Sequence, residues 1–195
     1  MRAAARVFAE RGYDQTTIKD LAEAIELAAG GIYHYVGSKD QLLELICDQL
    51  MHPLLERARE LTAVADEPPA EQLHALVALW VSHATQHRDH MLVFQQERHV
   101  IERGPRWRRI REDRKQFELL VEQVIERVHA SGRLALADSR LALSALLGMV
   151  NHTVQWYRPR GRLSPAQIAD GYAALLLVAQ PDVAAGSAEL SSAPV

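Results

Sequence analysis

The feature that most constrains this chain is the helical spacing of its apolar residues. They recur at positions i, i+3, i+4 and i+7 in segment after segment, as at Ile18, Leu21, Ala22 and Ile25. This spacing places apolar side chains on one face of a helix. No segment shows the strict alternation of a half-buried strand. The sequence therefore predicts an all-α protein of about nine helices.

Start and stop residues delimit these helices. Gly12 and Gly132 stand where C-cap glycines occur, and Ser38 and Ser164 are each followed three residues later by Gln, which is typical of a capping box. Pro53 is expected to kink its helix without ending it, because the apolar period resumes after it. The expected helices cover approximately residues 2–11, 16–25, 28–36, 38–61, 73–84, 89–98, 106–131, 139–157 and 164–179.

Composition narrows the class of protein. The chain of 195 residues has one cysteine, Cys47, which we expect to be a buried and unreactive thiol in a cytoplasmic protein. No segment is a signal peptide or has the roughly 20 apolar residues that span a bilayer. We expect domains at residues 1–46 and 47–180, and a disordered tail over 181–195, which is rich in Ala, Ser and Pro.

Net charge does not by itself indicate a nucleic-acid partner. The formal charge is −3, and residues 1–50 carry five basic and eight acidic side chains. Any DNA-binding activity must therefore depend on geometry and local placement.

The first fifty residues have the layout of a helix-turn-helix domain, with three short helices before a capped fourth. A recognition helix in a major groove about 12 Å wide favours small residues near the DNA and polar aromatic groups at the edge. The segment 28–36 provides both kinds of residue. The predicted DNA-binding residues are Thr16, Thr17, Ala29, Gly30, Gly31, Tyr33, His34, Tyr35 and Lys39. Lys39 follows the capped start of the fourth helix, where a phosphate would meet free N–H groups and a cation.

These residues resemble the DNA-binding domain of the TetR family. The elements that match in order and spacing are Phe8–Tyr13, Thr16–Ile18, Leu21-Ala22, Gly30–Tyr35 and Ser38–Leu42. The resemblance implies a dimeric, ligand-responsive regulator that binds double-stranded operator DNA, and repression is the default in the family. Four positions depart from the family pattern: Glu26, Ala28, Tyr35 and Val36.

Each of these residues also has a plainer interpretation. The alternatives are that Tyr33 is a packing residue of a three-helix core, that His34 is a solvated side chain, and that Lys39 is an ordinary surface lysine.

The last two helices are the predicted dimerisation surface. The helix over 139–157 is apolar nearly all round, so it should be buried on both sides. Paired with their symmetry mates, the two helices would form a four-helix bundle. The predicted dimerisation residues are Leu143, Leu147, Val150, Val154, Ile168, Tyr172, Leu175 and Leu176. The alternative is that both are ordinary core helices.

The middle helices are expected to enclose a pocket for a small hydrophobic effector. Large aromatic, Met and His side chains are the candidates for its walls. The predicted ligand-binding residues are Trp80, His83, His87, Met91, Phe94, Trp107, Met149, His152, Trp156 and Arg160.

Arginines near aromatic residues suggest the chemistry of the effector. Residues 98–115 carry eight basic and three acidic side chains, and three further arginines follow Trp156 and Tyr157. Such arginines suit phosphates and an adenine ring. The segment 156–161 also resembles a TetR subgroup that senses acyl-CoA thioesters and controls lipid or sterol breakdown, which implies a CoA thioester as effector. A solvated helix face is the alternative interpretation of the arginine run.

Other function classes have less support. His83, His87 and His90 have a spacing that suits a metal ion, but no Cys or close carboxylate completes a set, so we predict no metal and no cofactor. No phosphate-binding glycine loop, nucleophile elbow or catalytic triad is present, so we predict that the chain is not an enzyme. A helical scaffold that binds other proteins is the rival hypothesis.

Overall fold

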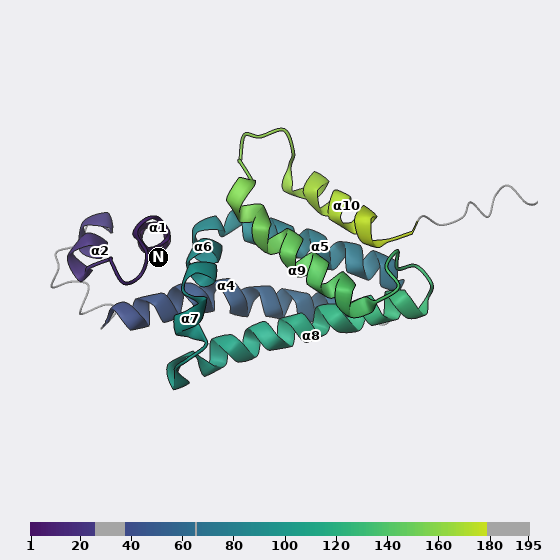
Figure 1. Cartoon of the computed structure of the whole chain (residues 1–195), viewed down its shortest axis with the longest axis horizontal. Coiled ribbons are helices and arrows are strands. Elements are labelled where there is room, and N and C mark those ends of the chain that lie inside the picture. The colour runs from purple at the N-terminus through teal and green to yellow at the C-terminus, as the bar shows by residue number, and fades with distance from the viewer. Residues whose placement is uncertain (26–37, 65, 179–195) are drawn as a thin grey trace, which may run out of the picture.

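The computed structural model describes residues 1–25, 38–64 and 66–178. Over these residues the chain forms α-helices, one short 3-10 helix and no strand, which confirms the all-α prediction (Figure 1). Among the described residues, β-type backbone pairing is limited to one isolated antiparallel bridge between Leu134 and Leu177. The elements are α1 (Arg2–Arg11), α2 (Ile18–Ala24), α4 (Lys39–Thr62), α5 (Pro69–Gln86), α6 (Arg88–Gln96), α7 (Arg98–Ile101), η1 (Pro105–Trp107), α8 (Arg108–Ala130), α9 (Ser139–Trp156) and α10 (Pro165–Leu176).

Helices α1 and α2 form the start of a small N-terminal unit at one end of the molecule (Figure 1). α1 ends at Gly12, whose φ of 80° is strained for a residue with a Cβ. α2 begins at Thr17, which shares a complete capping box with Asp20. Of the two threonines proposed as the start of this helix, Thr17 is therefore the cap. The predicted helix over 28–36 lies outside the described residues.

Helix α4 is the longest element and joins the N-terminal unit to the rest of the chain. Ser38 accepts a hydrogen bond from the Gln41 N–H, so this half of the predicted capping box is present. The helix continues through Pro53 to Thr62, as predicted. Because α4 runs unbroken from residue 39, the proposed boundary at residues 46 and 47 falls inside one helix. Cys47 lies on its buried face with no exposed surface.

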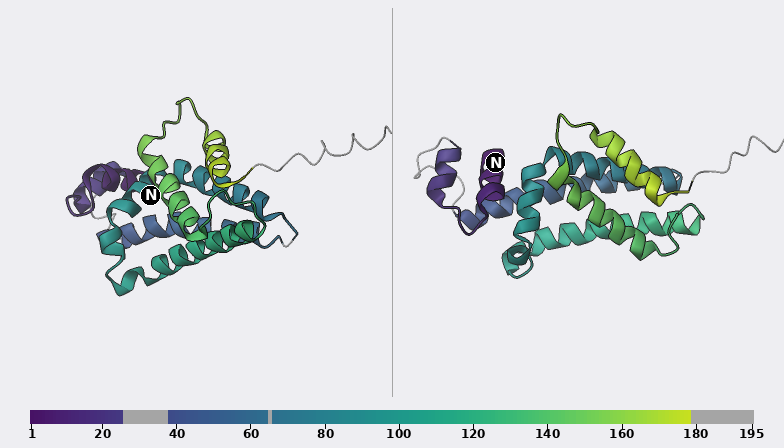
Figure 2. Two further views of the ribbon diagram at one scale, coloured as in Figure 1. Left: turned by 45° about the vertical axis from the view of Figure 1, so that its right-hand side comes forward. Right: turned by 45° about the horizontal axis from the view of Figure 1, so that its top comes forward.

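The body of the molecule is a bundle in which α5 is central. α5 packs against α4, α8, α9 and α10, and α8 also packs against α4 and α9. Figures 1 and 2 show α9 and α10 together on one side of this bundle. Gly132, with a φ of 71°, ends α8 as predicted. α10 begins with the complete Ser164–Gln167 capping box.

One short element was not predicted. The helix expected over 89–98 is α6, which ends at Gln96, and the unpredicted single turn α7 follows it. Glu97 lies between the two, as the C-cap of α6 and the N-cap of α7. α6 stands against α1, so this junction lies where the body meets the N-terminal unit (Figure 2). Among the described helices, none is both long and apolar enough to cross a membrane.

Candidate functional site: the DNA-binding unit and the effector cavity

The turn between α1 and α2 is fixed by the start of α4. The Lys39 ammonium donates hydrogen bonds to the carbonyl oxygens of Tyr13, at 2.8 Å, and Thr16, at 3.1 Å, and lies 4.2 Å from the centre of the Tyr13 ring. The Tyr13 hydroxyl donates to the Asp40 carboxylate. This bond, together with burial, raises the pKa of Tyr13, with burial the larger cause. Lys39 and Asp40, at the start of α4, therefore hold the turn between α1 and α2 in place.

The predicted DNA-binding residues that are described differ in their surroundings. Thr16 is buried and its hydroxyl donates to the Gly12 carbonyl, which makes it part of the turn. Thr17 lies at the exposed N-terminus of α2, where its hydroxyl also donates to Asp20 at 2.6 Å. The carboxylate's bonds to Thr17 and the nearby Arg11 lower the pKa of Asp20. Lys39 uses two of its three ammonium donors within the chain. The other six predicted DNA-binding residues, Ala29, Gly30, Gly31, Tyr33, His34 and Tyr35, lie outside the described residues.

A cavity lies in the body between α4, α5, α6, α8 and α9. Its volume is about 50 Å³. Its lining is mostly apolar but carries three polar side chains. The lining residues are Met51, Leu54, Trp80, Met91, Phe94, Arg114, Phe117, Glu118, Leu147 and Asn151. Trp80 and Phe117 meet edge to face, with ring centres 4.8 Å apart.

Only part of the predicted ligand set reaches this cavity. Trp80, Met91 and Phe94 line it. Trp107 is buried in η1 beside Gly104, and Met149 accepts a hydrogen bond from Thr153 through its carbonyl oxygen. His152, Trp156 and Arg160 lie on the surface. The structure therefore does not bring these last three side chains to the cavity, because they face away from the bundle at the end of α9 and beyond.

The histidines form a separate cluster at the junction of α5 and α6. The ring centres of His83 and His87 are 4.5 Å apart, and those of His87 and His90 are 5.5 Å apart. Nε2 of His83 lies 2.8 Å from the Leu50 carbonyl oxygen. Burial is the largest cause that lowers the pKa of all three, to about 4 for His83. The cluster is thus a largely buried joint between α4, α5 and α6 whose surroundings favour the neutral rings, and no group of three metal-binding side chains is found in the described part of the chain.

Much of the arginine run serves contacts within the chain. Arg111 donates to the carbonyl oxygens of Ile101 and Gly104, each at 2.8 Å. The ion pairs of the run are Arg98–Glu102, Arg106–Glu44, Arg109–Asp48, Arg114–Glu102 and Arg114–Glu118. These contacts hold α7 and η1 to α8, and α8 to α4. Arg158, Arg160 and Arg162, by contrast, are exposed.

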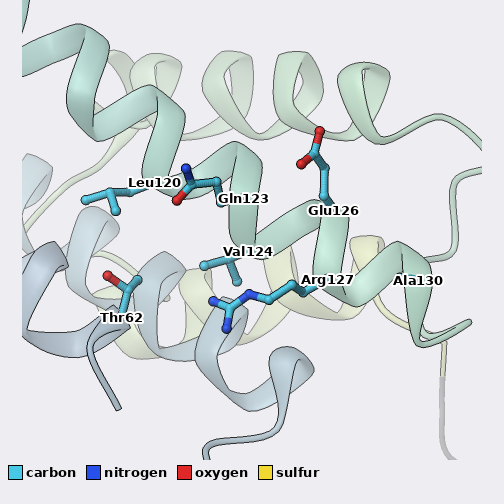
Figure 3. Close-up of a pocket in the computed structure, with 7 residues that line it drawn as sticks. All are labelled: Thr62, Leu120, Gln123, Val124, Glu126, Arg127 and Ala130. Atoms are coloured by element: carbon cyan, nitrogen blue, oxygen red, sulfur yellow. The ribbon is translucent and has the colours of Figure 1, made fainter. Parts of the chain in front are cut away.

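A second hollow lies at the opposite end of α8, beside the end of α4 (Figure 3). Figure 3 labels Thr62, Leu120, Gln123, Val124, Glu126, Arg127 and Ala130 along its sides. The Arg127 guanidinium is bound to the buried Gln72 amide, which in turn donates to carbonyl oxygens at the end of α4. This arginine fastens α8 to α4 and α5.

The predicted dimerisation residues need correction. Val150, Val154, Ile168 and Leu176 are buried within one chain, so a partner cannot reach them. Leu147 lines the cavity, and Tyr172 bonds to Thr153 at 2.9 Å. Of the set, Leu175 is the one that is widely exposed, at 65%. The sequence showed that the helices are apolar, but not which apolar side faces the same chain.

The exposed side of these two helices nevertheless carries apolar and small residues. We call it the α9–α10 face, made of Leu141, Ser144, Gly148, His152, Trp156, Gly171, Ala174, Leu175 and Val178. Leu141 is 57% exposed and Trp156 is 41% exposed.

Comparison with known proteins agrees with this geometry. The family model described as bacterial regulatory proteins, tetR family, matches residues 1–46, and that described as Tetracyclin repressor-like, C-terminal domain, matches residues 66–179. The HTH-type transcriptional repressor KstR2 of Mycobacterium tuberculosis is 26% identical over 181 residues, which cover 91% of this chain and 88% of the relative. The KstR2 of Rhodococcus jostii is 28% identical, with 89% of this chain and 85% of the relative covered.

Solved structures show the same likeness. The KstR2 structure from Mycobacterium tuberculosis has a TM-score of 0.78 at 26% identity and covers 91% of this chain and 92% of that one. AibR in complex with isovaleryl coenzyme A and operator DNA has a TM-score of 0.75 at 26% identity, with 90% and 94% covered.

A chain with this bundle and a helix-turn-helix start belongs to the class of DNA-binding transcriptional regulators. This chain belongs to the TetR family. The prediction that it is not an enzyme is thereby confirmed, since the family consists of regulators.

Proposed function

We propose that the chain is a repressor that leaves its operator when a hydrophobic acyl group fills the cavity between α4 and α9. The observation that carries this proposal is the position of the cavity wall. Met51 and Leu54 belong to α4, and Met91 and Phe94 belong to α6. These are the helices that also contact the N-terminal unit. A ligand that displaces them is therefore able to shift the equilibrium between DNA-binding and released conformations.

We further propose a CoA thioester as the effector. The cavity is too small for a whole thioester, so its nucleotide part would remain outside. The exposed Arg158, Arg160 and Arg162, beyond the end of α9, would then meet the phosphates on the surface, while Arg114 faces the polar part of the thioester inside. The AibR complex with isovaleryl coenzyme A supports this class of ligand.

The protein is proposed to act as a cytoplasmic homodimer through the α9–α10 face. Gly148, Gly171 and Ala174 allow two helices to approach closely, and Leu141, Leu175 and Trp156 supply apolar area around them. A dimer would present two recognition helices about 34–36 Å apart, which matches successive major grooves.

The test is a fluorescence-anisotropy titration of duplex DNA from upstream of the chain's own gene, at several salt concentrations. Specific, salt-sensitive binding that isovaleryl-CoA or a longer acyl-CoA reverses would support the whole proposal. Reversal should weaken in Arg160→Ala and persist in Arg108→Ala, a matched change of an exposed arginine on α8. Binding that no thioester reverses would overturn the effector class. No specific binding would contradict operator recognition at this site.

A further inference from the structure

The hydrogen bonds of Tyr13 form a link between the N-terminal unit and two helices of the body. Its carbonyl oxygen accepts from Lys39 and its hydroxyl donates to Asp40, both at the start of α4. Its backbone N–H donates to the Glu97 carboxylate at 3.0 Å, across 84 residues of sequence. The same turn is therefore held from α4 on one side and from the end of α6 on the other.

Glu97 is an unusual residue for its position. It is only 6% exposed, although isolated carboxylates are rarely buried. Its bond satisfies a buried backbone N–H that has no helical partner, because Tyr13 follows the end of α1. Both groups lie away from water, so solvent cannot readily replace either partner.

Neighbouring contacts also join α6 to the N-terminal unit. Gln96, the last residue of α6, donates from its side-chain amide to the Ala9 carbonyl oxygen of α1 at 3.3 Å. α1 packs along α6, as Figure 2 shows. The middle of α6 carries Met91 and Phe94 in the cavity wall. One nine-residue helix thus touches the cavity with its middle and the N-terminal unit with its end.

We propose that Glu97 is a positioning residue for operator binding: its carboxylate sets the angle of the helix-turn-helix against α6 by holding the Tyr13 N–H. This inference rests on the proposed function, and it adds a link through α6 beside the covalent link through α4. When α6 shifts, Glu97 moves the turn with it. A hydrogen bond transmits such a shift with more directional control than apolar contact alone, because its geometry is narrow.

The test compares three variants. Glu97→Ala removes the acceptor, Glu97→Gln keeps an acceptor oxygen of the same reach, and Glu126→Ala removes an exposed acid at the far end of α8. Affinity is measured for the specific upstream duplex and for a scrambled duplex. We expect Glu97→Ala to weaken specific binding about tenfold or more and to leave scrambled binding within about twofold. Glu97→Gln should restore most of the specific affinity.

The inference is overturned when Glu97→Ala binds the specific duplex as tightly as the wild type does. It is also overturned when this variant loses affinity for the specific and the scrambled duplex equally. Equal loss in Glu97→Gln and Glu97→Ala would also overturn it, because the acceptor would then not matter. If the wild type does not bind the upstream duplex, operator recognition there has failed, and a duplex selected by the wild type from a random library replaces it.

Hydrogen exchange tests the same link without DNA. The amide of Tyr13 should exchange faster in Glu97→Ala than in the wild type, and at the wild-type rate in Glu97→Gln and Glu126→Ala. The amides of α5 and α8 should not change, which separates loss of this link from general unfolding. Unchanged exchange at Tyr13 in Glu97→Ala would overturn the inference even when DNA affinity falls.

Discussion

The N-terminal unit and the body are held by partly different kinds of contact. Inside the body, apolar side chains from α4, α5, α8 and α9 pack on one another. Where the N-terminal unit meets the body, buried apolar residues of α1 also pack against α6, and Lys39, Asp40 and Glu97 in addition bind the turn at Tyr13. Apolar packing is strong but non-directional, whereas hydrogen bonds fix an angle. The difference indicates that the polar contacts at Tyr13 set the orientation of the N-terminal unit on the body.

The largest effect is expected from a core change in the body. Leu76→Ala removes a buried side chain of α5, the helix at the centre of the bundle, and should lower the free energy of unfolding by about 2–5 kcal/mol. Urea denaturation followed by circular dichroism measures this loss. The exposed Leu119→Ala is the control and should change stability by less than about 0.5 kcal/mol. A similar loss in both variants would contradict the picture of a body held by its apolar core.

Acid should weaken the joint at the histidine cluster. The pKa of His83 is about 4 in the folded chain, below its ordinary 6.5, because of burial and then His87. A depressed pKa means that the unfolded chain binds the proton more readily, so stability falls as pH drops below 6.5. Between pH 7 and 5 the loss from His83 alone should be about 2 kcal/mol.

Denaturation midpoints at several pH values measure this dependence. Arg57, Arg2 and Asp89 also act on the cluster, so the comparison uses His83→Gln, which should flatten the pH profile, and His99→Gln, an exposed histidine, which should not. An unaltered profile in His83→Gln would assign the pH dependence to other groups.

Lys39→Ala should affect the N-terminal unit and leave the body intact. It removes two hydrogen bonds and the interaction with the Tyr13 ring, so the local stability of α1 and α2 should fall by about 1–2 kcal/mol. Their amides should therefore exchange faster. If Lys39 also binds a phosphate, as proposed, the salt slope of operator binding should fall by about 1 for each phosphate that the variant no longer neutralises. A faster exchange with an unchanged slope would limit Lys39 to closing the turn.

The smallest effect is expected from the exposed ion pairs that join α4 to η1 and α8. Glu44→Gln removes the partner of Arg106 and should cost about 0.2–1 kcal/mol at low salt and less at high salt. Thermal unfolding at two ionic strengths measures it, with Glu60→Gln on α4 as the control. A loss above about 2 kcal/mol would mean that these charges, and not the apolar core, join α4 to α8.

Local sequence patterns predicted the elements well because helix caps and apolar periods are local. Ser164, Thr17 and Gly132 mark helix ends through contacts within a few residues. The turn at Glu97 was missed because a break between α6 and α7 has no Gly or Pro to mark it. The partner of Glu97 lies 84 residues away, and no spacing rule relates residues at that distance.

The sequence predicted the types of residue that line the candidate site better than it predicted the individual residues. Trp80 and Phe94 were predicted because large aromatic residues line pockets, but Arg114 and Asn151 depend on how far α8 and α9 stand from α4. Val150 and Ile168 were wrong as dimer residues because an apolar period does not distinguish a neighbour in the same chain from one in another.

The position of Cys47 has a consequence for redox chemistry. Its side chain is fully buried in α4, and burial raises the pKa of the thiol to about 12. The reactive thiolate is therefore scarce at neutral pH, and oxidants or thiol reagents have no access to it. Regulation by this chain should be insensitive to peroxide, and a cysteine introduced on its surface would be labelled alone, with the native thiol unmodified.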